Sequence, residues 1–283
     1  MRNVDFHIDD TIVLRIRTLR GALLRTNKAK PPWFDDKESF IYRIDSGTIG
    51  MGTDSLASLL NNYVFAYPKA PLKDVSISIE GNQVKMTGTT HKVTDIPFEV
   101  VGDLLATPEG KIQLHPTSIK AAGIPVKGLM GLFGVELDDL IKATESRGVK
   151  VDDNDITMDP EVMLPPPEIR GKIIAVRIEG NELVQVFGLS NDKSSGGGSS
   201  RPTASRRRGS NYMYFRGGTI RFGKLTMTNA DMRLIDRDAK TPFDFSMDNY
   251  NRQLVAGYSK NKPNLGLLVF MPDYSKVKEH PPR

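Results

Sequence analysis

Four histidines are the side chains of this sequence best suited to general acid–base chemistry near neutral pH. They are His7, His91, His115 and His280. None has a second histidine nearby, or a serine paired with it in a recognisable motif. Catalysis would need His91 or His115 to converge with carboxylates in a polar cleft. We therefore expect structural or surface histidines, no catalytic residue and no enzyme.

The sequence also offers little that could hold a metal ion or a cofactor. It has no cysteine, which excludes disulfides, thiolate metal sites and a cysteine nucleophile. The acidic run 152–155 resembles the start of a calcium loop, but Ile156 and Thr157 stand where a ligand and a glycine are needed. Glycine-rich phosphate loops and the G-x-S-x-G elbow are absent from the sequence. We expect a polar turn at 152–155, no metal and no cofactor.

Positive charge is concentrated in one short stretch. The formal net charge is +5, and Arg201 and Arg206–Arg208 lie at the end of a serine- and glycine-rich run that is typical of a flexible linker. Tyr212 and Tyr214 follow, and basic residues beside aromatic ones can bind single-stranded nucleic acid. The alternation of these tyrosines is equally typical of a β-strand. We favour a solvated linker over residues 189–210 and expect no nucleic-acid partner.

Most of the remaining sequence alternates with the period of two that marks half-buried strands. Val4, Phe6 and Ile8 share one parity, and residues 39–51 continue the pattern. Thr53 is expected to cap a short helix. Beyond it, residues 75–86 form a hairpin around a Gly-Asn turn, residues 96–107 form a strand, and residues 242–245 are expected to be a loop.

A second helix is predicted from residue 128 to residue 143, the most apolar segment of the chain. The length suits one large domain or two ordinary ones. We expect a β-rich main domain (1–188), the linker (189–210) and a C-terminal β extension (211–283) that docks on the main domain. The turn 79–82 recurs as 178–181. Either an internal duplication or convergence on good turn chemistry explains the repeat. The predicted fold is α+β: a long, curved, mainly antiparallel sheet with two short helices on its concave face.

The segment from Val75 to Gly188 resembles bacterial lipid-binding proteins of the tubular lipid-binding (TULIP-like) type. The shared order is a hairpin, a strand ending in residues 109–116 (EGKIQLHP), an apolar helix and a proline-rich exit to a closing hairpin. Residues 222–231 (FGKLTMTNAD) are similar to repeats in AsmA-like envelope proteins. The resemblance implies an apolar groove and lipid handling in the bacterial cell envelope.

We expect non-enzymatic binding or transfer of a lipid or another hydrophobic ligand, because ligand sites are commonly concave and mostly apolar. The alternative is a structural or interaction module that pairs with a protein partner through exposed strand edges. The residues expected to line the groove are Leu56, Leu59, Leu60, Tyr63, Leu129, Met130, Leu132, Phe133, Leu137, Leu140 and Ile141.

The sequence gives conditional information about location. No apolar run approaches the roughly 20 residues that cross a bilayer. Asp5, Asp9 and Asp10 stand where the apolar part of a signal peptide would be. The expectation is the periplasm or cell envelope if a targeting segment has been removed, and the cytoplasm otherwise. Peripheral contact with a membrane is compatible with either.

Overall fold

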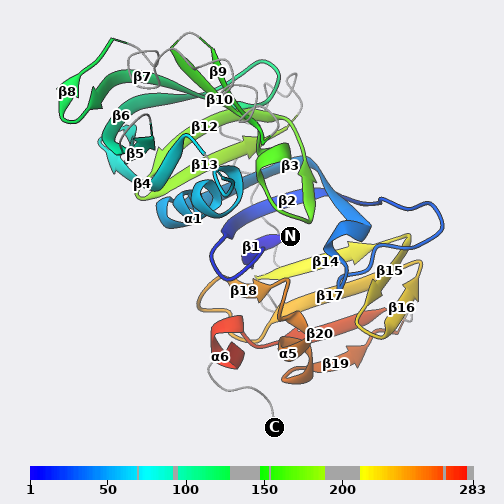
Figure 1. Ribbon diagram of the computed structural model, residues 1–283. Helices are drawn as coiled ribbons and strands as arrows, with labels where there is room; N and C mark the ends of the chain where they lie inside the picture. The colour runs from blue at the N-terminus through cyan, green and yellow to red at the C-terminus, as the bar shows by residue number, and fades with distance from the viewer. Residues whose placement is uncertain are drawn as a thin grey trace, which may run out of the picture. The chain divides into compact units, whose positions relative to one another are not determined.

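The computed structural model describes residues 1–68, 70–91, 95–127, 147–152, 154–188, 211–263 and 266–278. These residues form mainly β-strands with a few short helices, so the expected α+β class with a curved, mainly antiparallel sheet is confirmed (Figure 1). The expected second helix, including Leu129 to Ile141, and the expected linker 189–210 lie outside the described residues. None of the described helices is long and apolar enough to cross a membrane.

The chain groups into two compact units, each built from separated segments. Unit 1 comprises Met1–Ile49, Pro166–Arg170 and Gly188–Arg283. Unit 2 comprises Gly50–Pro165 and Gly171–Phe187. This grouping differs from the expected boundaries at residues 188 and 211. The N-terminal strands belong with the strands after residue 211 because β1 (Arg2–His7) pairs with both β14 (Tyr212–Arg216) and β18 (Phe243–Ser246).

Unit 1 is built on a sheet in which β3, β2, β1, β14, β17, β20 and β19 are neighbours in that order. Its other strands and helices are β2 (Val13–Arg25), β3 (Phe40–Gly52, whose last residues count with unit 2), β11 (Glu168–Arg170), β15 (Thr219–Phe222), β16 (Leu225–Thr228), β17 (Asp231–Asp236), β19 (Tyr258–Asn261), β20 (Leu267–Met271), η1 (Lys37–Ser39), α5 (Tyr250–Val255) and α6 (Tyr274–Lys278).

An aromatic core holds unit 1 together. Val4 and Phe6 of β1 are buried, as their alternation predicted. The prediction of a loop at residues 242–245 was wrong. β18 pairs in parallel with β1, and its Phe243 and Phe245 are fully buried. This pairing joins segments more than 200 residues apart in the chain, so no local pattern could indicate it.

Unit 2 contains a curled sheet with the order β4-β5-β6-β7-β10-β9 (Figure 1). The elements of the unit are α1 (Thr53–Leu59), η2 (Leu60–Val64), β4 (Leu72–Glu80), β5 (Gln83–His91), β6 (Asp95–Ala106), β7 (Ile112–Ala121), β8 (Ile124–Pro125), β9 (Val149–Asp152), β10 (Asp155–Met158), α4 (Pro160–Met163), β12 (Ile173–Glu179) and β13 (Glu182–Phe187).

Local sequence signals located several of these elements. The hairpin β4–β5 turns at Gly81, and β12–β13 turns at Gly180. Both glycines have a positive φ that side chains disfavour. The helix cap was misplaced by one residue, because Gly52 occupies the N-cap position and Thr53 begins α1. The helix continues as the single π-helical turn η2.

Candidate ligand-binding surfaces

His115 pairs with a carboxylate on an open surface. Its Nδ1 lies 2.7 Å from Oδ1 of Asp155, and the histidine side chain is 54% exposed. Asp155 also accepts a hydrogen bond from Gln113 on the neighbouring strand. Such a pair stabilises the β7–β10 contact, and its exposure gives it no desolvated pocket for catalysis. The side chain of His91 and all of His280 lie outside the described residues.

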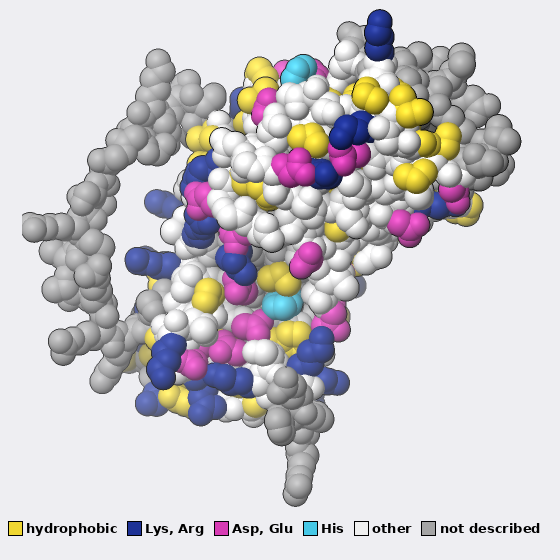
Figure 2. Space-filling view, turned by 90° about the vertical axis from the view of Figure 1, so that its left-hand side faces the viewer, with side chains coloured by type: hydrophobic (Ala, Val, Ile, Leu, Met, Phe, Trp, Pro, Cys, Tyr) yellow, Lys and Arg dark blue, Asp and Glu magenta, His cyan; other side chains and the backbone are white. Residues whose placement is uncertain are grey.

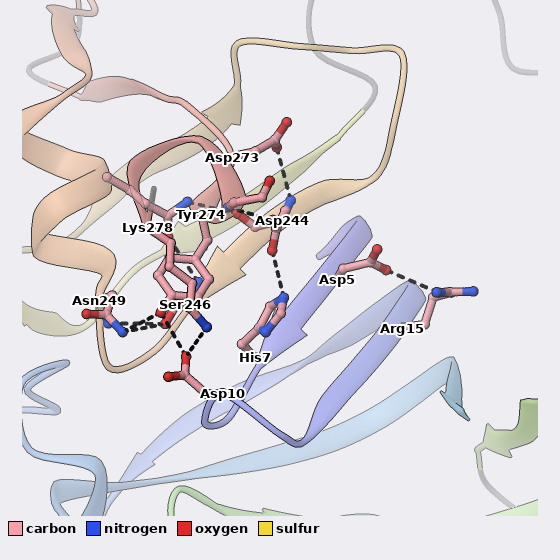
Figure 3. A network of polar contacts seen from close by, with 12 residues as sticks. Asp5, His7, Asp10, Arg15, Asp244, Ser246, Asn249, Asp273, Tyr274 and Lys278 are labelled. Atoms are coloured by element: carbon pink, nitrogen blue, oxygen red, sulfur yellow. Dashed lines mark hydrogen bonds and ion pairs between the residues drawn. The ribbon is translucent and has the colours of Figure 1, made fainter. Parts of the chain in front are cut away.

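His7 belongs to a polar network at the end of β1 (Figure 3). Its Nε2 lies 2.7 Å from Oδ1 of Asp244 on β18. Burial raises the pKa of Asp244, but the hydrogen bonds from His7 and from the N–H of Ser275 outweigh it and hold the pKa below its usual value. The Tyr274 hydroxyl donates to Asp10 at 2.8 Å. These contacts fasten α6 to β1 and β18, which is a structural role.

Asp236 is a carboxyl group that the fold buries. Asn211 donates a hydrogen bond to its Oδ2 at 2.9 Å, and the N–H of Asp238 donates to its Oδ1 at 2.7 Å. Burial raises the pKa of Asp236 to about 6 despite these bonds. The folded protein therefore favours the protonated form between the usual aspartate pKa and pH 6.

This raised pKa predicts a pH dependence of stability. Because the folded state holds the proton more tightly than the unfolded state, Asp236 contributes less stability as the pH rises through the window from about 4 to about 6. Relative to an Asp236→Asn variant, the wild type should lose about 1–3 kcal/mol of unfolding free energy between about pH 4 and pH 7. Urea unfolding of both proteins across this range measures the difference, and a difference that stays constant with pH would contradict the assignment.

No metal site forms among the described residues. Within the described ranges, no three carboxylate or histidine side chains gather in a way that could hold an ion. Of the acidic run expected to be a polar turn, Asp152 ends β9 and Asp155 begins β10, whereas the side chain of Asp152 and all of Asp153 lie outside the described part.

The sheet of unit 2 has one face that is apolar from strand to strand. Directly opposed residues form rows across it, and their side chains share this face. The rows are Ile77–Met86–Val100–Ile119, Leu104–Leu114–Ile156–Val151 and Ala106–Ile112–Met158–Val149. Most of these side chains are buried, whereas Ile77, Leu104, Ala106 and Met158 are only half-buried. We call this set of rows the apolar face.

The opposite face of the same sheet is polar. Lys85 bridges Glu80 and Glu99 at 2.8 Å each, and Lys120 lies 2.6 Å from Glu99. The hydrogen bonds from Lys120 and then Lys85 lower the pKa of Glu99 to about 2. Figure 2 shows acidic and basic side chains interspersed on the visible surface rather than separated by sign. The two faces of the sheet are therefore chemically distinct.

The described part of the predicted groove lies beside the apolar face. Leu56, Leu59 and Leu60 of α1 and η2 are buried, and α1 packs on β4. Tyr63 is half-buried, and its carbonyl accepts a hydrogen bond from Arg147 at 2.8 Å. The remaining predicted residues, Leu129, Met130, Leu132, Phe133, Leu137, Leu140 and Ile141, lie outside the described residues.

Unit 1 contains a groove of about 1140 Å³ that the sequence did not indicate. It lies between the second half of β2 and β14, and the segment 29–32 and the start of β15 border it as well. Arg20, Arg25, Lys30 and Arg216 are among its lining residues. We call it the split-sheet groove. The only sequence signal was the aromatic alternation at Tyr212 and Tyr214, both of which line it.

Comparison with known proteins gives no relative from which a function could be transferred. No family model matches the chain, and no curated protein or solved structure is detectably similar to it.

Proposed function

We propose that the protein binds a lipid or another hydrophobic ligand without chemical conversion, on the apolar face of unit 2. The observation that carries the proposal is the continuity of that face. Its rows together span the strands from β4 to β9 and contain no charged side chain. The opposite face of the same sheet carries ion pairs. Ligand sites are commonly concave and mostly apolar, and the sheet that carries this face is curled.

The energetics favour an aliphatic ligand. Each methylene group moved from water onto such a surface contributes about 0.8 kcal/mol, so an acyl chain gains affinity along its whole length. The half-buried Ile77, Leu104 and Met158 mark places where the face is not fully covered. Buried Leu56, Leu59 and Leu60 extend the apolar surface at the β4 side. The resemblance to TULIP-like proteins supports the same ligand class and a place in the bacterial envelope.

A matched pair of neighbouring leucines tests the proposal. Leu104 opposes Leu114 on the apolar face, whereas Leu105 opposes Gln113 on the polar face and is 53% exposed. Leu104→Gln should weaken uptake of a fluorescent phospholipid roughly tenfold or more, because its amide is desolvated when the ligand binds. Leu105→Gln should leave uptake unchanged. Circular dichroism melts establish that both variants fold.

Equal uptake by the two variants would place the ligand elsewhere. If the wild type itself took up no phospholipid, the lipid proposal would be wrong. The alternative function, pairing with a protein partner through strand edges, is favoured by a separate observation in unit 1.

A further inference from the structure

The split-sheet groove lies where β2 and β14 extend beyond their pairing with β1. β1 pairs with β2 as far as Thr18, and Leu19 exchanges two backbone hydrogen bonds with Met1 at 2.7 and 3.0 Å. β2 then continues to Arg25. On the other side, only Tyr212 of β14 has a partner in β1, and β14 continues to Arg216. β2 and β14 therefore run on, parallel to each other, beyond their last residues paired with β1.

The facing edges of these strands carry backbone groups in need of partners. Every second residue of an extended strand turns its N–H and C=O toward the same side. Within the described residues, no strand pairs with β2 beyond Leu19 or with β14 beyond Tyr212 on the sides that face the groove. The length of β2 from residue 20 to residue 25 matches about 20 Å of extended chain. Unpaired strand edges are templates for a further strand.

At the segment 29–32, which lines the groove, the chain pairs with β15 within unit 1. The N–H of Phe34 donates to the carbonyl of Arg221 at 3.0 Å, and the N–H of Arg221 donates to the carbonyl of Pro32 at 2.8 Å. The segment 29–32 is thereby fixed to β15. These hydrogen bonds position residues that border the groove on this side.

The charge of the groove selects its occupant. Arg20, Arg25, Lys30 and Arg216 line it, and none of these four has an ion-pair partner in the described part of the chain. Among the described residues, no aspartate or glutamate lines the groove. The segment 189–210 of the same chain carries four arginines, one lysine and a single aspartate. Its net charge is positive, like that of the groove, so the segment is a poor electrostatic complement to the groove.

We infer that the split-sheet groove binds an extended, acidic peptide segment of a partner protein, which inserts between β2 and β14 and runs antiparallel to both. Backbone hydrogen bonds on two sides supply the affinity, and the four cations select acidic side chains. An acyl chain would leave the two polar edges desolvated without partners, which disfavours a lipid here. The inference concerns unit 1 and does not depend on the lipid proposal for unit 2.

The test uses the full chain and synthetic peptides of about ten residues that alternate valine and glutamate. A second peptide has the same sequence with N-methylated amides, which removes the N–H donors but keeps the charges. A third has lysine in place of glutamate. Binding is measured by fluorescence anisotropy, and amide hydrogen exchange is followed over residues 20–25 and 213–216.

The expected result is that only the unmodified acidic peptide binds, with exchange slowed in β2 and β14. Arg20→Glu combined with Arg25→Glu should weaken this binding roughly tenfold or more. Lys224→Glu, at an exposed lysine of the same unit that does not line the groove, should not weaken it comparably. Equal binding of the N-methylated or the lysine peptide would overturn the inference. So would no binding, or an arginine-dependent preference for phosphatidylglycerol vesicles over the peptide.

Discussion

Replacement of Phe34 by alanine is expected to destabilise unit 1 by about 3–5 kcal/mol, the usual cost of removing a buried phenylalanine ring. Phe34 is 1% exposed and lies at the centre of an aromatic cluster. Its ring centroid is 5.3 Å from that of Phe40, 5.4 Å from Phe215 and 5.0 Å from Phe222. The substitution removes contacts among segments from both ends of the chain, so the cavity cannot collapse by moving one side chain.

Urea unfolding followed by the fluorescence of Trp33, the only tryptophan of the chain, reports on this unit directly. The matched control is Val255→Ala, because Val255 of the same unit is 72% exposed and should change the unfolding free energy by no more than about 0.5 kcal/mol. A loss below about 1 kcal/mol for Phe34→Ala would mean that the cluster does not hold unit 1 together.

Gly102→Val is expected to disrupt the unit 2 sheet, with a loss of about 3 kcal/mol. A Cβ atom at Gly102 would lie 2.4 Å from the carbonyl oxygen of His115 and 2.9 Å from Cα of Pro116. These are backbone atoms of β7, so no side chain can rotate away and the β6–β7 ladder must separate. The position coincides with a register shift between Val101 and Gly102.

Gly52→Val serves as the control in the same unit, because a Cβ atom there has no heavy atom within 4 Å and the residue has an ordinary φ of −68°. It should cost far less than Gly102→Val. Thermal melts by circular dichroism, with hydrogen exchange of the β5, β6 and β7 amides, separate the two variants. A Gly102→Val protein as stable as the Gly52→Val protein would contradict the close approach of the two strands.

Local patterns predicted the elements whose partners are near in the chain. Gly81 and Gly180 indicated hairpins because a positive φ in a tight turn is a strictly local requirement. The alternation from Val75 onward likewise indicated which side chains share a face. The apolar face follows from these local rules, although the sequence could not say which strand lies beside which.

Such local patterns could not predict pairing between strands that lie far apart in the chain. β18 looked like a loop because its run from Phe243 to Ser246 is short, and only its parallel partner β1 makes it a strand. For the same reason, the sequence did not indicate that residues 1–49 belong to the same unit as the strands after residue 211. The split-sheet groove is lined by residues of β2, β14 and the segment 29–32, which lie far apart in the sequence, so no single segment could indicate it.

The two binding surfaces rest on different physical features. The apolar face gains affinity from burial of hydrocarbon and places no demand on direction. The split-sheet groove gains affinity from directional backbone hydrogen bonds and from charge. A protein that bound lipid through unit 2 and an acidic partner segment through unit 1 would combine cargo binding with partner recognition in one chain. Each surface can be disabled separately, since Leu104 and Arg25 belong to different units.

Native mass spectrometry of the protein purified from a bacterial host, followed by organic extraction and lipid analysis, tests lipid binding most directly. We expect a population with one added lipid mass per chain, and its loss from the Leu104→Gln protein but not from the Leu105→Gln protein. A clean mass of the bare chain, with no uptake of phospholipid added afterwards, would contradict the proposed function.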